Sequence, residues 1–169
     1  GMAPHDRARR GISFVPQGRE IFPLLTVREN LETGFASKLM KDSGFPPEIF
    51  ELFPVLKEMM HRRGGDLSGG QQQRVFLARA LCLEADLFFM DEPFVGVDIT
   101  TEHKIVELLH HLADAGKTLL VVHHDLSKVG TYFDKVILLN NRLIACGETA
   151  TTFIDENIAR TYGGQLDVL

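Results

Sequence analysis

Two continuous apolar segments, residues 87–90 and 118–122, constrain the fold of this chain more than any other feature. Neither segment alternates polar with apolar residues, and unbroken apolar runs are expected of strands buried on both faces of a parallel sheet. Between them, apolar side chains recur at helical spacing from Ile105 to Leu112, and Gly116 supplies a helix stop. The sequence therefore predicts a strand, a helix and a second parallel strand, which is the repeating unit of an α/β fold.

The same alternation continues over the rest of the chain. Turn and cap residues delimit helices predicted over 69–84, 99–115 and 125–131, and strands predicted over 11–15, 87–90, 118–122 and 134–139. The pair Asn140-Asn141 predicts a hairpin to residues 143–146, and short helices are predicted near 149–153 and 155–162.

Residues 26–66 have the pattern of a mostly helical insert. Thr26, with Glu29 three residues later, forms a capping-box pattern for a helix over residues 27–36. Pro46-Pro47 opens a second helix that runs through Phe53 and that Pro54 ends.

The composition is that of one globular domain, because 44% of the 169 residues are hydrophobic and 24% are charged. A net charge of −5 argues against a broad surface for nucleic acid. The chain has no run of 18 apolar residues, so we expect no direct insertion into a membrane. Residues 1–10, which carry an arginine cluster, are expected to be a disordered tag or N-terminal stump.

The octapeptide from Leu67 to Arg74, Leu-Ser-Gly-Gly-Gln-Gln-Gln-Arg, is the strongest local signal. Ser68 with Gln71 is a capping box that opens a helix. Gly69 and Gly70 would leave the N–H groups of the first turn uncovered, and with the helix dipole behind them these groups would form an anion site. Both interpretations can hold at once, but capping alone rarely requires two glycines followed by three glutamines.

Asp91 and Glu92 come where a buried parallel strand is predicted to end. Open α/β sheets assemble their ligand sites at this edge. Asp91 could hold Mg²⁺, through water, while Glu92 directs a base at the water that attacks a γ-phosphate. Acidic pairs after strands are common, so the pair alone does not decide between a structural and a catalytic role.

Three further residues are weak signals when taken singly. His124 follows the strand over 118–122 and could donate a hydrogen bond to a γ-phosphate oxygen, or it could be an ordinary loop residue. Asp98 precedes the helix over 99–115 and is suited to cap it. Gln17 follows the first strand, and its amide could contact Mg²⁺ or the attacking water.

Taken in order, these residues resemble the nucleotide-binding domain of ATP-binding-cassette (ABC) transporters, and the resemblance covers essentially the whole chain. The matching segments are the Q-loop at Gln17, the signature at Leu67–Arg74, the Walker B strand at Leu87–Asp91 with the catalytic Glu92, the D-loop at Asp98 and the switch histidine at His124. The resemblance implies a P-loop NTPase-like (RecA-like) α/β fold, with a mainly parallel sheet and a helical subdomain. It divides the chain into a strand and Q-loop (11–25), a helical signature subdomain (26–73) and the C-terminal part of the ATPase core (74–169).

The resemblance also implies partners and a location. Two such domains would close on two ATP molecules with Mg²⁺, and Ser68, Gly69, Gly70 and Gln71 would contact the γ-phosphate held by the other subunit. Closure would drive a transmembrane permease, which places the domain in the cytoplasm, peripheral on the inner face of the cell membrane. No contact with nucleic acid is implied.

The chain departs from the family pattern in lacking a Gly-x-x-x-x-Gly-Lys-Ser/Thr loop, the Walker A element that cradles the triphosphate. We therefore expect the N-terminal β/P-loop portion to be missing, and the isolated chain to bind no ATP and to be inactive. We also expect an exposed apolar sheet surface through which the isolated chain self-associates.

A second departure concerns the subfamily. Residues 11–73 resemble importers of branched-chain amino acids or urea, whereas residues 74–169 resemble importers of manganese, zinc or iron chelates. The chain is therefore predicted to be a hybrid joined within the signature, and the transported substrate cannot be read from it.

The preferred function is the ATP-hydrolysing subunit of a bacterial ABC importer, present as a truncated chain, which couples ATP hydrolysis to solute uptake. One alternative is a catalytically inactive remnant that acts only as an interaction module with a permease or a full-length ATPase. Another is a soluble DNA-repair or translation ATPase. The absence of coiled-coil heptads, tandem cassettes and basic tracts argues against that class.

Overall fold

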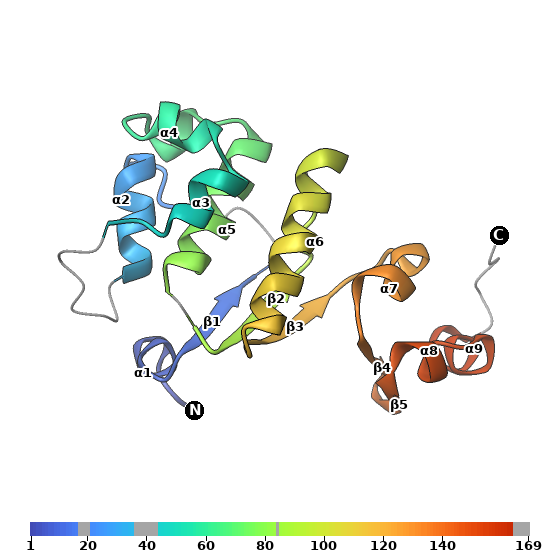
Figure 1. Cartoon of the computed structure of the whole chain (residues 1–169). Coiled ribbons are helices and arrows are strands. Elements are labelled where there is room, and N and C mark those ends of the chain that lie inside the picture. The colour runs from blue at the N-terminus through green and yellow to red at the C-terminus, as the bar shows by residue number, and fades with distance from the viewer. Residues whose placement is uncertain (17–20, 36–43, 84, 164–169) are drawn as a thin grey trace. The chain divides into compact units, whose positions relative to one another are not determined.

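The structure is a computed structural model of the whole chain, and it describes residues 1–16, 21–35, 44–83 and 85–163 (Figure 1). These residues form two compact units, Gly1–Val122 and His123–Leu169.

The first unit contains a parallel sheet with the strand order β1 (Ile12–Val15), β2 (Leu87–Asp91) and β3 (Thr118–Val122). Along the register, Val15 pairs with Met90 and Asp91 pairs with Val122. Leu87, at the start of β2, pairs with Thr118, at the start of β3, so the two strands begin and end together. The parallel strands predicted from the two apolar segments are confirmed.

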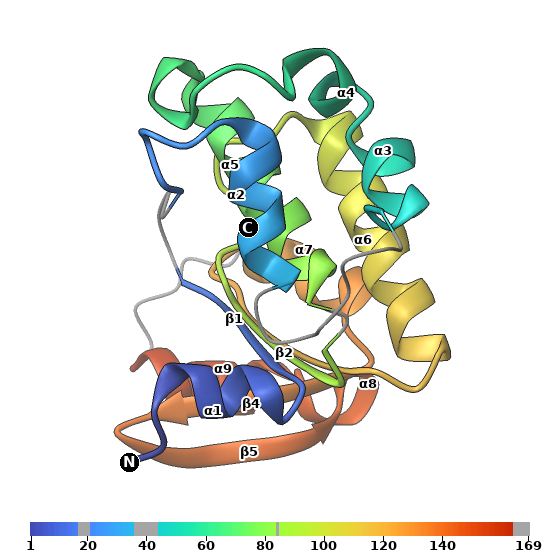
Figure 2. The same ribbon diagram turned by 90° about the vertical axis from the view of Figure 1, so that its left-hand side faces the viewer.

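Helices α5 (Gly69–Cys82) and α6 (Ile99–Asp114) lie on one face of this sheet (Figure 2). The side chains of Val15, Phe88 and Met90 in the sheet are buried, as are those of Phe76 in α5 and Ile105 in α6. At about 25 cal/mol per Å² of buried apolar area, such aromatic and branched side chains are the main stabilising contribution to the unit. The predicted domain boundary between residues 73 and 74 falls inside α5, a continuous helix.

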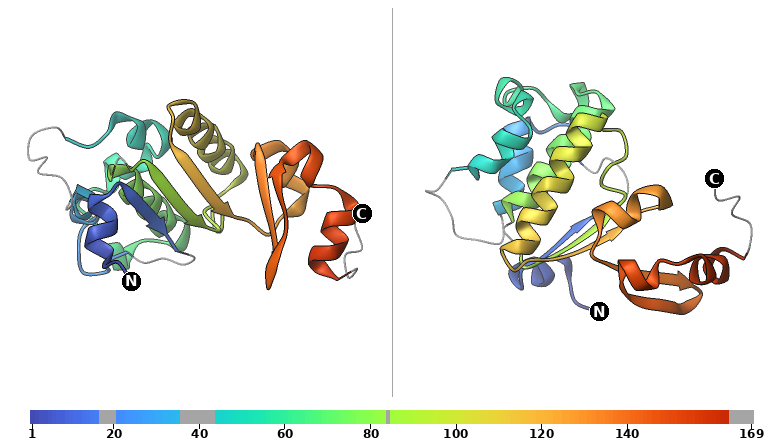
Figure 3. Two further views of the ribbon diagram at one scale, coloured as in Figure 1. Left: turned by 90° about the horizontal axis from the view of Figure 1, so that it is seen from below. Right: turned by 45° about the vertical axis from the view of Figure 1, so that its right-hand side comes forward.

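The opposite face of the sheet, seen from below in Figure 3, has no helix as long as α5 or α6 over it within the first unit. Phe14, Leu120 and Val122 are 61%, 39% and 56% exposed. The expectation that residues 118–122 are buried on both faces is therefore wrong for this chain, because α5 and α6 cover one face only. The face that carries these three side chains, together with Phe89 of β2, is called the open sheet face below.

The helical insert folds against α5. It comprises α2 (Val27–Glu32), η1 (Thr33–Phe35), α3 (Pro47–Leu52), α4 (Val55–Met59) and η2 (Gly64–Asp66). The predicted capping box is confirmed, since the Thr26 N–H donates to Glu29 Oε2 at 2.7 Å and the Glu29 N–H donates to Thr26 Oγ1 at 3.2 Å. The predicted helix over 27–36 ends earlier as an α-helix and continues as η1, and residue 36 lies outside the described residues.

Asn30 holds the entry to this insert in place. The side chain is fully buried, accepts a hydrogen bond from the Phe22 N–H at 2.8 Å and donates to the carbonyl oxygens of Phe22, Leu25 and Thr26. A buried amide with all of these partners fixes the path of residues 22–26, because an unpaired buried polar group would be costly.

The N-terminus differs from expectation. Residues 4–9, expected to be disordered, form the short helix α1 (Pro4–Arg9), with Pro4 in its first turn and Asp6 near its positive end. A proline at this position is compatible with helix initiation because it has no N–H that would need a partner. In the part of the chain that the structure describes, no helix has the length and apolar character needed to cross a membrane.

The second unit consists of α7 (Leu126–Tyr132), the hairpin β4 (Lys135–Asn140) and β5 (Arg142–Glu148), and the helices α8 (Thr149–Thr152) and α9 (Asp155–Tyr162). The hairpin predicted at Asn140-Asn141 is confirmed, and Asn141 adopts the left-handed conformation with φ 53°. Within the described residues β4 pairs with β5 alone, so the strand predicted over 134–139 is not part of the three-stranded parallel sheet.

Candidate functional site

The two predicted carboxylates lie at the carboxyl edge of the parallel sheet. Asp91 is the last residue of β2 and pairs with Val122 at the end of β3, and the Glu92 N–H donates to the Val122 carbonyl oxygen at 3.0 Å. Asp91 is half-buried, whereas Glu92 is only 7% exposed. The sheet thus holds both acidic residues at the edge where ligand sites of open α/β sheets are found.

The backbone at Glu92 is held in an unfavourable conformation. Its φ is 50°, in the left-handed region that residues other than glycine, asparagine and aspartate rarely occupy. Such a conformation costs on the order of 1 kcal/mol or more and persists only where the surrounding structure imposes it. Since strained backbone clusters at active sites, the geometry supports a functional role for this carboxylate.

The octapeptide opens α5 as predicted. The Gln71 N–H donates to Ser68 Oγ at 3.4 Å, and the Ser68 N–H donates to Gln71 Oε1 at 2.9 Å, so the capping box is confirmed. Gly69 and Gly70 form the first turn, at the positive end of a 14-residue helix. N–H groups in this position, with the dipole of a long helix behind them, suit a negatively charged ligand.

Gly70 has a packing role that sequence reasoning missed. A Cβ at this position would lie 2.8 Å from the carbonyl oxygen of Gly96, in the loop that follows Glu92. The absence of a side chain therefore lets this loop approach the first turn of α5. The second glycine of the octapeptide is the sequence signal for this contact, but its partner is not visible in the sequence.

Asp98 caps α6, as its sequence position predicts. Its Oδ1 accepts from the Thr101 N–H at 2.9 Å and its Oδ2 accepts from Thr101 Oγ1 at 2.7 Å. Hydrogen bonds from the Thr101 hydroxyl and backbone lower the pKa of Asp98 to about 2, and the nearby charge of Arg74 adds to the effect. Because this pKa is lowered, the stabilisation from the charged cap is present above the ordinary pKa and is lost only as the pH falls through about 2.

The other two predicted residues are not placed at the sheet edge. Gln17 lies outside the described residues. His124 belongs to the second unit, two residues after the end of β3, so its proximity to Asp91 and Glu92 stays a prediction. Its neighbour His123 packs against the rings of Tyr132 and Phe133, with centroid separations of 6.4 and 6.0 Å.

The carboxylates fit a role in binding Mg²⁺. In the described ranges no group of three or more His, Cys, Asp or Glu side chains could hold a metal ion. Mg²⁺ at phosphate sites is commonly held by one or two carboxylates together with phosphate oxygens, so no such group is needed. The half-buried Asp91 offers a hard oxygen ligand of the required kind at the end of β2.

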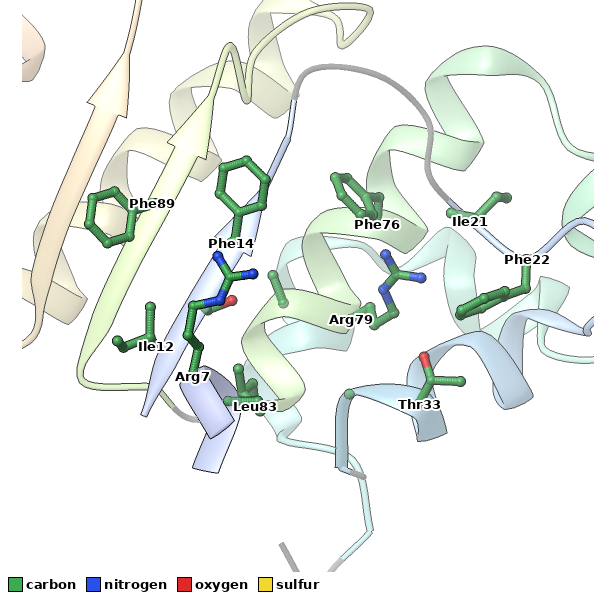
Figure 4. A pocket seen from close by; sticks show the side chains of 14 residues that line it. Arg7, Ile12, Phe14, Ile21, Phe22, Thr33, Phe76, Arg79, Leu83 and Phe89 are labelled. Atoms are coloured by element: carbon green, nitrogen blue, oxygen red, sulfur yellow. The ribbon is translucent and has the colours of Figure 1, made fainter. Parts of the chain in front are cut away.

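A separate cavity of about 890 Å³ opens between α1, β1, η1 and α5 (Figure 4). Four phenylalanine rings and two arginines are among the residues that line it, and Arg79 stacks on the Phe76 and Phe22 rings at 4.7 and 5.4 Å. None of the predicted site residues that the structure describes lines this cavity.

Comparison with solved structures defines the class of the fold. A dimeric ATP-binding cassette in a post-hydrolysis state bound to ADP and Pi superposes with a TM-score of 0.72 at 30% identity, over 83% of this chain and 63% of that one. A nucleotide-free ATP-binding cassette from an ABC transporter gives a TM-score of 0.65 at 27% identity, over 96% of this chain and 68% of that one. The predicted α/β P-loop NTPase fold is confirmed.

The family follows from the sequence comparisons. The family model described as ABC transporter matches residues 2–95, more than half of the chain. The chain belongs to the ABC transporter family. Among its curated relatives, the zinc transport system ATP-binding protein TroB of Treponema pallidum is 60% identical over 96% of this chain and 64% of its own length. The manganese transport system ATP-binding protein MntB of Listeria monocytogenes is 45% identical over 92% of this chain and 68% of its own length.

These matches bear on the extent and origin of the chain. A second manganese transport protein MntB, from Halalkalibacterium halodurans, is 58% identical over 66% of the chain and 44% of its own length. The chain thus spans between 44% and 68% of these three relatives. Because one metal-transport relative matches 96% of the chain, a hybrid origin is not needed to explain residues 11–73.

Proposed function

We propose that the chain acts in the ATP-binding subunit of a bacterial ABC importer that takes up a metal ion, and that it couples ATP hydrolysis to this transport. The similarity of 60% identity over nearly the whole chain to a zinc transport protein is the observation that carries the proposal. The clustering of Asp91 and Glu92 at one sheet edge, and the glycine-opened α5, supply the required chemistry.

Within this proposal each site residue has a defined role. Glu92 orients and deprotonates the attacking water, while Asp91 and Gln17 hold Mg²⁺, which when bound neutralises charge on the phosphate oxygens. Ser68, Gly69, Gly70 and Gln71 present N–H and hydroxyl groups to the γ-phosphate of an ATP molecule bound by a second ATP-binding domain. His124 donates to a γ-phosphate oxygen. Asp98, at the end of the loop before α6, lies at the interface with the second ATP-binding domain.

The proposed mechanism uses a P-loop that lies outside these 169 residues. The 169 residues contain no Gly-x-x-x-x-Gly-Lys-Ser/Thr sequence, so we propose that the chain alone neither binds nor hydrolyses ATP. The same observation favours a second candidate function, in which the chain is an inactive module that binds a permease or a full-length ATPase. Hydrolysis in a complex with a P-loop subunit, dependent on the octapeptide of this chain, would exclude that alternative.

Capture on permeases tests the transport assignment. The chain, immobilised on beads, is exposed to detergent-solubilised permease subunits of a manganese or zinc importer and, as the matched control, of an amino-acid importer. We expect the beads to retain the metal-importer permease only. In intact cells the same contact would place the chain at the inner face of the membrane. Equal retention of both, or of neither, would contradict the proposed substrate class and partner.

We also propose that the isolated chain self-associates through the open sheet face. Phe14 and Val122 are more than half exposed there, and a contiguous apolar patch of this kind favours association. Replacing both residues with lysine is expected to shift sedimentation velocity profiles from oligomer to monomer.

Leu24 provides the control for this experiment. It is 81% exposed and lies on the loop before α2, so Leu24→Lys adds a positive charge without touching the sheet. We expect this variant to self-associate like the parent chain. Equal effects of the Leu24 and the sheet substitutions would show that net charge, and not the open sheet face, governs association.

A further inference from the structure

The loop between Glu92 and α6 is attached to α5 at both of its ends. At one end, Gln73 Nε2 donates to the Pro93 carbonyl oxygen at 3.3 Å, and this contact is buried. At the other end, Arg74 Nη2 contacts Asp98 Oδ2 at 2.6 Å and donates to Thr101 Oγ1 at 3.3 Å. Gln73 and Arg74 are adjacent on the helix that the octapeptide opens.

We propose that Arg74 is a positioning residue that, by holding Asp98, fastens the loop from Pro93 to Asp98 onto α5, so that the phosphate-facing first turn and the base Glu92 move as one body. The inference rests on the proposed function of these two elements. It assigns Arg74 no contact with substrate, since Arg74 would act through Asp98 and the loop.

Two turn hydrogen bonds in the loop from Pro93 to Asp98 are long, with 3.3 Å from the Val95 N–H to the Glu92 carbonyl and 3.4 Å from the Val97 N–H to the Phe94 carbonyl. Near its middle, Gly96 approaches α5 so closely that a Cβ at Gly70 would lie 2.8 Å from its carbonyl oxygen. The loop therefore depends on α5 for its shape, and the strained φ at Glu92 requires that shape to be imposed from outside.

The ion pair is not needed to cap α6. Thr101 alone satisfies both carboxylate oxygens of Asp98, through its amide and its hydroxyl. The Arg74 side chain is 21% exposed, compared with 56% for Asp98, so the guanidinium spans from the helix surface to a solvent-facing cap. A single guanidinium nitrogen, Nη2, contacts both the Asp98 carboxylate and the Thr101 hydroxyl, so one group of Arg74 joins the cap of α6 to α5.

Amide hydrogen exchange on the complete 169-residue chain, measured by NMR without nucleotide, tests the inference. In Arg74→Gln and in Asp98→Asn, which keeps a capping side chain, we expect the Val95 and Val97 amides to exchange about two- to fivefold faster, the range for a partly exposed ion pair. The double variant should exchange no faster than either single variant, because both remove the same contact. Arg74→Lys should restore part of the protection.

Controls separate positioning from general stability. The Met90 amide in β2 should stay unchanged in all of these variants. The midpoint of urea unfolding should stay unchanged in the two Arg74 variants, whereas Asp98→Asn, which removes the charged cap of α6, should lower it slightly. Arg28→Gln, which removes an exposed ion pair with Glu32 at 3.8 Å on α2, should leave the loop amides unaffected. The inference would be overturned if the effects of the two single variants on the exchange rates were additive in the double variant, or if the Val95 and Val97 amides exchanged no faster. It would also be overturned if, in the Arg74 variants, the midpoint of urea unfolding fell and amides throughout the chain exchanged faster. Because no nucleotide is present, such a failure would leave the proposed function standing.

Discussion

Replacing Gly34 with alanine is expected to lower the free energy of unfolding by about 2–3 kcal/mol, the upper part of the range for overpacking a core. Gly34 is buried in η1, where a Cβ would overlap the carbonyl oxygen of Arg79 and lie 2.7 Å from the Cβ of Cys82. Both atoms belong to α5, so the clash cannot be relieved by turning a flexible side chain. Urea unfolding followed by circular dichroism measures the change.

Gly130→Ala is the matched control for Gly34→Ala. Gly130 lies inside α7, and nothing lies within 4 Å of a Cβ built at this position. Alanine there should raise stability by about 0.5–1 kcal/mol, because glycine is the poorer helix former. A loss below 0.5 kcal/mol in Gly34→Ala would contradict the close packing of the helical insert on α5.

Replacing Ser68 with aspartate is expected to weaken ATP-dependent association with a P-loop-bearing cassette about 100-fold, because like charges placed together at an interface cost several kcal/mol. Ser68 is the N-cap of α5, and aspartate is as good a capping residue as serine. The substitution therefore keeps the helix but sets a negative charge against the γ-phosphate. Fluorescence anisotropy of the labelled chain, titrated with the ATP-loaded cassette, measures the loss.

Ser68→Asn separates charge from shape at the same position. Asparagine also caps helices well and carries no charge, so this variant should associate within a few-fold of the parent chain. Both variants should unfold at the same urea concentration as the parent. If aspartate and asparagine weaken association equally, the first turn of α5 does not face a phosphate group.

The parts of the fold that were predictable carry local signals. Thr26, Ser68 and Asp98 each precede a helix that begins at the next residue, because a side-chain oxygen in this position satisfies an N–H of the first turn. The two apolar segments predicted β2 and β3 to within one residue, and therefore the place of Asp91 and Glu92 at the sheet edge.

The remaining features depend on contacts between distant residues. Arg74 contacts Asp98, 24 positions further along the chain, and Gly70 in α5 approaches Gly96 in the loop after Glu92. Neither pair has a sequence pattern of its own. The prediction that Leu120 and Val122 are buried is wrong. An apolar strand sequence shows that burial of its side chains would be favourable, but it does not show whether another element covers them. The left-handed Glu92 is likewise imposed by surrounding structure and carries no local signature.

In the function proposed above, this chain presents α5 to an ATP molecule held by another subunit. The most direct test of this role is sedimentation velocity of the labelled chain mixed with the full-length Treponema pallidum relative, with and without Mg·ATP, alongside calorimetric titration of Mg·ATP into the chain alone. We predict association with the relative only when ATP is present, and no saturable binding of ATP by the chain alone. Nucleotide-independent association, or saturable binding of Mg·ATP by the isolated chain, would contradict this role.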